Sequence, residues 1–128
     1  MRILIFGETN KNRQQKYRIF AKEVLHKIKD RVPDNAVALN IILVCDDYIH
    51  KLNKQFLNKD RPTDVLSFLI QDKVWGEIYI SRDRARVQAR QEKISIEQEI
   101  FNLIAHGILH LANYSHREMK KIRRELNR

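Results

Sequence analysis

The sequence predicts an α+β fold in which one domain, residues 1–128, holds a mixed sheet of about four strands covered by helices. Short β-rich apolar runs and longer segments with helical periodicity follow one another in the order βαβαββααα. The length of 128 residues suits a single domain with a real core. Three glycines and two prolines leave no stretch that could serve as a linker.

The first part of the chain predicts a strand, a helix and a turn. Residues 1–6 form a β-rich run that stops at Gly7, and residues 13–31 place apolar side chains at helical spacing. These apolar residues are Tyr17, Phe20, Ala21, Val24, Leu25 and Ile28. The Pro-Asp-Asn sequence at residues 33–35 then predicts a turn.

A second strand and a second helix follow. The apolar, partly β-branched run at residues 37–45 predicts a buried strand. Either Asp46 or Asp47 can cap the next helix, whose apolar stripe consists of Ile49, Leu52, Phe56 and the neighbouring Leu57. The single cysteine, Cys45, has no disulfide partner in the chain, and we expect it to have a packing role in a reducing compartment.

The second half predicts a hairpin followed by three helices. Residues 63–70 and 74–80 read as two strands that pair around a turn at residues 71–73. A helix over residues 81–91 comes next, and Ser95 with Gln98 makes a capping box for the helix that carries Ile96, Ile100, Leu103, Ile104 and Leu111. A basic helix over residues 117–127 is expected last.

Three of the five histidines stand in the segment His-Gly-Ile-Leu-His-Leu-Ala-Asn-Tyr-Ser-His, residues 106–116. On a helix, His106 and His110 project from the same face one turn apart, so their ring nitrogens can converge on one ion. Asn113 can adopt the left-handed conformation that ends a helix, and this turn lets His116 approach the other two. The spacing therefore predicts a metal site, with these three histidines as ligands, on a C-terminal helix and the turn after it. The other two histidines lie in polar helical stretches and are expected to be solvated.

Three neutral imidazoles leave one position for water in a tetrahedral zinc site, whereas structural zinc sites usually have four protein ligands. Zinc lowers the pKa of such a water from about 15.7 to about 7. The sequence therefore predicts a hydrolase in which the metal-bound water is the catalytic group and one zinc ion is held per chain. Imidazole ligands also suit nickel, copper and iron, so another divalent metal stays open.

The formal net charge of +9 favours a polyanionic partner, and phosphate contacts would suit such a surface. A basic protein is also simply more soluble, so charge alone does not decide. Arg82, Arg86 and Arg90 align on one predicted helix face, which fits a solvated surface as well as contact with RNA.

The longest apolar runs, at residues 3–6 and 41–45, are far too short to cross a bilayer. Met1 leads straight into a strand-like segment without a signal peptide. We expect a cytoplasmic protein with no membrane partner.

The histidine spacing also matches the metzincin proteases, which place a general-base glutamate directly after the first histidine. Here that position is Gly107, which has no side chain to accept a proton. The missing carboxylate matters less for hydrolysis of a phosphodiester, because a metal can act on the phosphoryl oxygen and the water together. Gly107 therefore favours phosphodiester hydrolysis over proteolysis.

The segment 106–116 resembles a signature of the YbeY family of bacterial metallo-endoribonucleases, His-Gly-x-Leu-His-Leu-x-Gly-Tyr-Asp-His. Residues 59–68, Lys-Asp-Arg-Pro-Thr-Asp-Val-Leu-Ser-Phe, resemble the second signature of that family, and residues 52–53 and 75–78 resemble further family positions. The resemblance implies a zinc-dependent endoribonuclease, specific for single-stranded RNA, that acts in ribosome quality control and in 3′-end maturation of small-subunit (16S) rRNA. Ribosomal RNA and the ribosome are the partners it implies.

Some positions depart from the family pattern. Leu57 and Asn58 stand where the family has arginine and glycine, and the resemblance implies that this arginine matters for activity. Asn113 replaces a glycine, and Ser115 replaces an aspartate that could orient a metal ligand. These departures favour an alternative function, an RNA- or ribosome-associated metal-binding factor with weak or lost catalysis. A zinc metalloprotease is a third, less favoured alternative.

The remaining candidate site residues come from the second signature. Asp64 is the candidate for a side-chain base, although a cap or an orienting group for a histidine explains it equally well. Lys59 and Arg61 are candidates for contact with RNA phosphates, and ordinary loop charges are the alternative.

Overall fold

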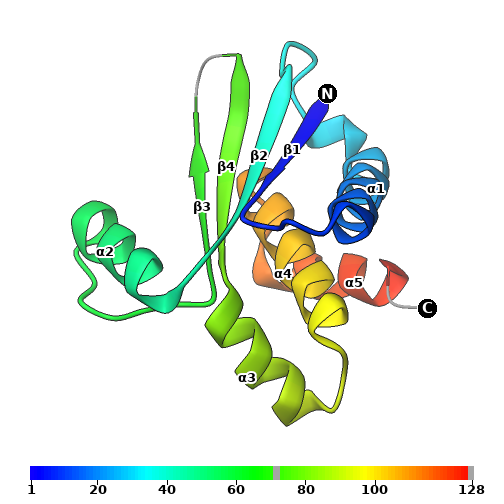
Figure 1. The fold of residues 1–128 in the computed structure, drawn as a ribbon. Coiled ribbons are helices and arrows are strands. Elements are labelled where there is room, and N and C mark those ends of the chain that lie inside the picture. The colour runs from blue at the N-terminus through cyan, green and yellow to red at the C-terminus, as the bar shows by residue number, and fades with distance from the viewer. Residues whose placement is uncertain (71–72, 127–128) are drawn as a thin grey trace.

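In a computed structural model, which describes residues 1–70 and 73–126, the chain forms a four-stranded mixed sheet with helices on both faces (Figure 1). The strands are β1 (Arg2–Phe6), β2 (Ala38–Val44), β3 (Val65–Leu69) and β4 (Val74–Ser81), in the spatial order β1-β2-β4-β3. β1, β2 and β4 run parallel, and β3 pairs antiparallel with β4 at the edge. The predicted fold class and hairpin are confirmed, while Gln71 and Asp72 of the predicted turn lie outside the described residues.

The helices follow the predicted order. They are α1 (Lys11–Lys27), the short 3-10 helix η1 (Lys29–Arg31), α2 (Asp46–Leu57), α3 (Arg82–Glu92), α4 (Ile96–Leu111) and α5 (His116–Leu126). Asn127, the last residue of the predicted final helix, lies outside the described residues. None of the helices in the described part of the chain has the length and hydropathy that crossing a membrane requires.

The core lies between one face of the sheet and the helices α1 and α4. Burial alternates along β2, so that Leu39, Ile41 and Leu43 point into the core and their neighbours point to the other face. α4 is the central helix, and Ile104 and Ile108 on it are fully buried. Figure 1 shows α1, α4 and α5 gathered on this side of the sheet and α2 on the other.

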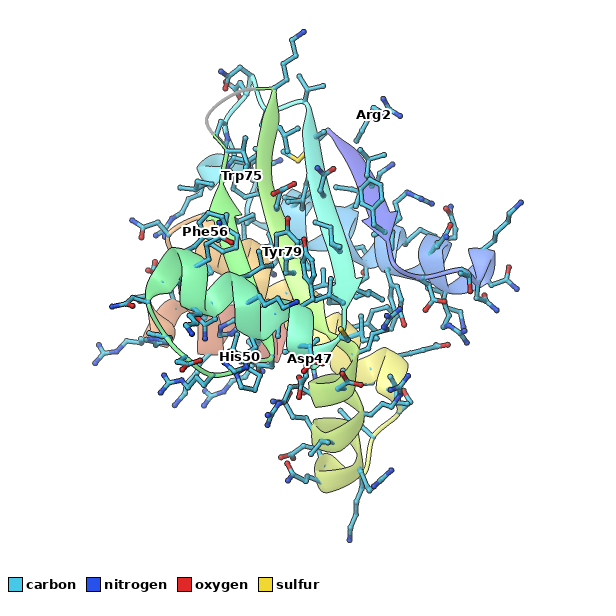
Figure 2. All side chains as sticks on the ribbon, turned by 60° about the vertical axis from the view of Figure 1, so that its left-hand side comes forward. Arg2, Asp47, His50, Phe56, Trp75 and Tyr79 are labelled. Carbon is cyan, nitrogen blue, oxygen red and sulfur yellow. The ribbon has the colours of Figure 1, made fainter. Side chains whose placement is uncertain are left out.

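α2 covers only the part of the outer face that β3 and β4 form. The ring of Phe56 meets that of Phe68 at 5.6 Å between centroids, and Phe68 lies 6.0 Å from Tyr79. Figure 2 shows Phe56 and Tyr79 close together where α2 passes in front of the sheet. Phe56 is nevertheless 58% exposed and Leu57 47% exposed, so the apolar stripe of α2 is not buried at its C-terminal end. The helix lies at the edge of the sheet, where its last turn has no layer above it.

Two further expectations for this region are wrong. Cys45 is exposed at the N-cap position of α2 and has no packing role in the core. The carboxylate of Asp46 does not cap α2, because it accepts a hydrogen bond of 2.6 Å from the Ser81 hydroxyl. Asp46 thus joins the start of α2 to the end of β4.

Helix α4 approaches β4 so closely that its contact point has no room for a side chain. A Cβ atom on Gly107 would lie 2.6 Å from Cγ2 of Ile78 in β4. On the other side of the same contact, the Ser67 hydroxyl of β3 donates to the Gly107 carbonyl at 3.1 Å. Gly107 therefore fixes how deeply α4 is seated on the sheet.

We predict that Gly107→Ala destabilises the protein by about 1–3 kcal/mol, the usual cost of overpacking a core. Alanine has the higher helix propensity, so an uncrowded helical glycine would instead be stabilised by this change, by about 1 kcal/mol. Urea unfolding of wild type, Gly107→Ala, Ile78→Ala and the double variant measures the coupling between the two sites. We expect the cost of Gly107→Ala to disappear in the Ile78→Ala background. Equal costs in both backgrounds would contradict the steric explanation.

Candidate functional site

Helix α4 presents two of the three predicted metal ligands. The Ser95 hydroxyl caps α4 by accepting the N–H of Gln98 at 3.0 Å, which is one half of the predicted capping box, while the Gln98 side chain donates to Asn102. His106 and His110 then lie one turn apart, with 6.0 Å between ring centroids. His106 is half-buried and His110 is exposed, so the first ring is held by its surroundings and the second faces solvent.

The turn after α4 contains the predicted left-handed residue. Asn113 has a φ of +61°, and its N–H donates to the His110 carbonyl. The N–H of Tyr114 donates to the Leu109 carbonyl, so the last carbonyls of α4 are satisfied. The predicted helix stop at Asn113 is confirmed, and α5 begins three residues later at His116.

A capping box that the sequence analysis missed fixes the start of α5. The Ser115 hydroxyl accepts the N–H of Glu118 at 3.2 Å, and the Glu118 carboxylate accepts the N–H of Ser115 at 3.0 Å. The Ser-x-x-Glu spacing at residues 115–118 is the sequence signal for it. Ser115 therefore has a structural role of its own: it starts the helix on which His116 is the first residue.

Arg31 ties α5 to η1. Its guanidinium lies 4.0 Å from the centroid of the Tyr114 ring and 2.5 Å from the Glu118 carboxylate. Met119, one residue further along α5, is 3% exposed. The position of α5 thus depends on a cation–π contact, an ion pair and an apolar anchor.

His106 stands among charged groups from several elements. Burial lowers the pKa of His106 below its ordinary value, and the positive charge of Arg123 lowers it further. The Asp64 carboxylate acts in the opposite direction, and His110 and His116 add smaller lowering effects on the pKa of His106. The imidazole is therefore mostly neutral at pH 7, which is the form that binds metal ions.

Asp64, the candidate base, lies just before β3. The Gln88 side chain donates to its carboxylate at 3.2 Å, and the N–H of Ser81 donates to its backbone carbonyl at 2.9 Å. Burial raises the pKa of Glu99, a residue that the sequence analysis did not single out, and the charge of Asp64 raises it further. The structure thus brings Asp64 within electrostatic range of His106 and adds Glu99 as a second carboxyl group nearby.

Lys59 and Arg61 are exposed on the loop between α2 and β3. Asn53, which is 2% exposed, donates its side-chain amide to the Arg61 carbonyl at 2.9 Å. The backbone carbonyl of Asn53 also accepts the N–H of Lys59, at 3.1 Å. A buried side chain therefore holds the backbone of the loop while both cations face solvent.

His50 has a structural role that its sequence context did not reveal. Its Nε2 lies 2.7 Å from a carboxylate oxygen of Asp60, and this hydrogen bond lowers the pKa of Asp60. Figure 2 places His50 at the edge of α2 away from Phe56. His50 is thus a second brace for the loop, whereas His26 is exposed as expected.

The structure does not gather the three predicted ligands around one point. Among residues 1–70 and 73–126, no three His, Cys, Asp or Glu side chains form a group that could hold a metal ion. His106 and His110 lie together on α4, and His116 is within electrostatic range of His106. The donor chemistry, three imidazoles of which His106 is mostly neutral, fits zinc. The ligand set of His106, His110 and His116 stays a prediction.

The departures from the family pattern have local explanations in two cases. Asn58 ends α2 with a φ of 56°, a left-handed conformation that asparagine tolerates in place of glycine. Asn113 replaces glycine for the same reason. Leu57, which stands in place of the arginine, has an exposed apolar side chain.

Comparison with known proteins agrees with these motifs. The family model described as endoribonuclease YbeY matches residues 5–127. The endoribonuclease YbeY of Thermotoga maritima is 43% identical over 107 residues, which is 82% of this chain and 70% of that protein. The endoribonuclease YbeY of Aquifex aeolicus is 37% identical, covering 87% of this chain and 88% of the relative. The solution structure of TM1509 from Thermotoga maritima matches with a TM-score of 0.62 at 38% identity, over 97% of this chain and 85% of that one.

We predict that Ser115→Ala lowers the free energy of unfolding by about 1 kcal/mol, because the first turn of α5 loses its cap. Ser115→Asp is expected to keep the wild-type stability, since aspartate caps helices as well as serine does. Urea unfolding measures both values, and amide hydrogen exchange tests whether the loss is concentrated in α5. Equal destabilisation by the two substitutions would contradict the capping role of Ser115.

Proposed function

The chain belongs to the YbeY endoribonuclease family, and from this premise we propose that it is a zinc-dependent hydrolase that cleaves single-stranded RNA. The observation that carries the proposal is the local arrangement around α4. His106 and His110 share one face of the helix, Asp64 acts on His106 electrostatically, and His116 follows the Asn113 turn.

Zinc bound by His106, His110 and His116 would supply Lewis acidity toward a phosphoryl oxygen and would acidify water. Side chains of the protein would perform the proton transfer and the binding of phosphates. The Asp64 carboxylate, whose charge acts on His106, would accept a proton from the attacking water. Lys59 and Arg61, on the loop that Asn53 holds, provide positive charge for the phosphates on either side of the cleaved bond.

We further propose that the substrate is ribosomal RNA and that the protein works with the ribosome in the cytoplasm. The setting would be ribosome quality control and maturation of the 3′ end of 16S rRNA. The family membership supports the RNA substrate, and the net charge of +9 supports a strongly anionic partner.

A metal-binding factor with weak or lost catalysis is the second candidate function. Leu57 favours it, because an exposed apolar side chain cannot replace the phosphate contacts of an arginine. Proteolysis is not supported. A side chain at Gly107 would meet Ile78, so the glutamate of a peptidase does not fit at this position without moving the helix.

Zinc binding is the first testable consequence. We expect the metal-free protein to bind about one zinc ion per chain and to gain about 2.7 kcal/mol of stability at a zinc concentration 100 times Kd. Calorimetric titration and thermal unfolding provide the measurements. His110→Ala should abolish tight binding, while His26→Ala, an exposed histidine on α1, serves as the matched control. Unchanged affinity in His110→Ala would remove that histidine from the ligand set.

RNA cleavage is the second consequence. We expect the zinc-loaded protein to cut a labelled single-stranded RNA, to spare the same sequence in a duplex, and to lose activity in His110→Ala and when zinc is chelated. Asp64→Asn should lower kcat while KM changes little, because the carboxylate acts in the chemical step. Intact single-stranded RNA in the presence of zinc would favour the binding factor, and cleavage of an unfolded protein would revive the protease.

The loop cations can be tested by salt dependence. Replacing Lys59 and Arg61 by glutamine should flatten the plot of log affinity against log salt concentration by up to about 1.4, since each contact with a single-strand phosphate contributes about 0.7. Binding of RNA to the metal-free protein measures this slope without turnover. A slope equal to that of wild type would show that neither cation contacts phosphate.

A further inference from the structure

One face of α5 concentrates positive charge next to the candidate site. Lys120 and Lys121 follow Arg117 by three and four residues and precede Arg124 by four and three, so all four lie on one side of the helix. All four are exposed. Together with His116 they line a groove of about 630 Å³. We call these four residues the α5 cations.

The acidic residues of α5 are engaged elsewhere. Glu118 pairs with Arg31, and Glu125 lies 2.6 Å from the ammonium of Lys27. In the part of the chain that the structure describes, none of the α5 cations forms an ion pair. Among the described residues, the four cations are therefore not held in ion pairs, although the charge of Lys121 contributes to lowering the pKa of Glu125.

The arginine row of α3 is different. Arg82 donates to the Gly7 carbonyl, and Arg86 lies 3.4 Å from the carboxylate of Asp83. Arg84, on the same helix, pairs with Asp46 at 3.2 Å. Much of the positive charge of α3 serves to hold the fold together, which leaves α5 as the better surface for an external anion.

The apolar side of α5 is not available to a lipid surface. Met119 is buried in the core, and Ile122 and Leu126 pack against it. A helix that binds membranes must insert its apolar side into the bilayer. The exposed side of α5 offers cations without an apolar anchor, which suits a flexible chain of phosphates.

We propose that the α5 cations bind the phosphate backbone of the RNA strand where it extends beyond the histidine site. The groove includes His116, and the cations from Arg117 to Arg124 continue along about 10 Å of helix, at 1.5 Å per residue. This length exceeds the rise of one nucleotide in a duplex strand, about 3.4 Å. Contacts with phosphates carry no sequence information, so α5 contributes affinity and direction without base specificity. This inference rests on the proposed function for the link to cleavage, but binding itself can be measured without turnover.

The test compares two quadruple variants with equal loss of charge. The first replaces the α5 cations by glutamine. The matched control replaces four exposed cations on other surfaces, namely Arg2, Lys11, Lys22 and Lys51. Both are titrated, in metal-free form, with a single-stranded RNA over a range of salt concentrations. A third variant exchanges lysine and arginine at the four α5 positions and keeps the charge.

We expect the α5 variant to lose about 100-fold in affinity at 0.1 M salt and to flatten the salt slope by up to about 2.8, the order that four single-strand phosphate contacts contribute. The matched control should keep the wild-type slope, and the charge-conserving variant should restore binding. Lengthening the RNA should increase the affinity of the wild type but not of the α5 variant. Circular dichroism and the thermal midpoint check that each variant is folded.

Three outcomes would overturn the proposal. These are an unchanged affinity of the α5 variant, an equal loss in the matched control, and binding of polyglutamate through the α5 cations as tightly as RNA, which would identify an acidic protein as the partner. The two proposals fail separately. If RNA binds through α5 but the zinc-loaded protein never cleaves it, only the nuclease function is refuted. If neither cleavage nor binding changes in the α5 variant, only the role of α5 is refuted.

Discussion

The close contact between α4 and β4 is the constraint on which the rest of the structure depends. Each element contributes a glycine to this contact, Gly107 from α4 and Gly76 from β4. A Cβ atom on Gly107 would clash with Ile78, and one on Gly76 would clash with Leu111. The backbone of α4 can therefore lie against the sheet, and the Ser67 hydroxyl holds the carbonyl of Gly107 there. His106, the neighbour of Gly107, is drawn into a half-buried position near Asp64 by the same contact.

The local features of the fold were accessible from the sequence because short-range chemistry decides them. The strand that ends at Gly7, the cap at Ser95 and the left-handed Asn113 are each fixed by the conformational preference of one residue. The capping box of α5 belongs to the same class. Its signal, serine followed three residues later by glutamate, is present in the sequence at residues 115–118.

The features that the sequence could not reveal depend on contacts between distant segments. No local sequence pattern predicts that β4 lies between β2 and β3, or that Asn53 supports the backbone around Arg61. Phe56 fits an apolar stripe by periodicity, yet it is 58% exposed although its ring contacts Phe68 of β3. For the same reason, helical spacing could place His106 and His110 side by side, but the approach of His116 depends on how a second helix docks.

That docking makes the C-terminal part of the site a separate unit of local stability. The ion pair of Arg31 with Glu118 joins residues 87 positions apart, and because both side chains are 41% exposed it adds little stability. Proteins open locally in cooperative units, and those held by few buried contacts open most readily. α5 has Met119 as its one buried residue, with Ile122 and Leu126 only partly buried, so we expect it to open more readily than the sheet and α4. If α5 detached, His116 and the cationic face would leave the site together. A ligand that binds the site for a long time should therefore slow the hydrogen exchange of the α5 amides.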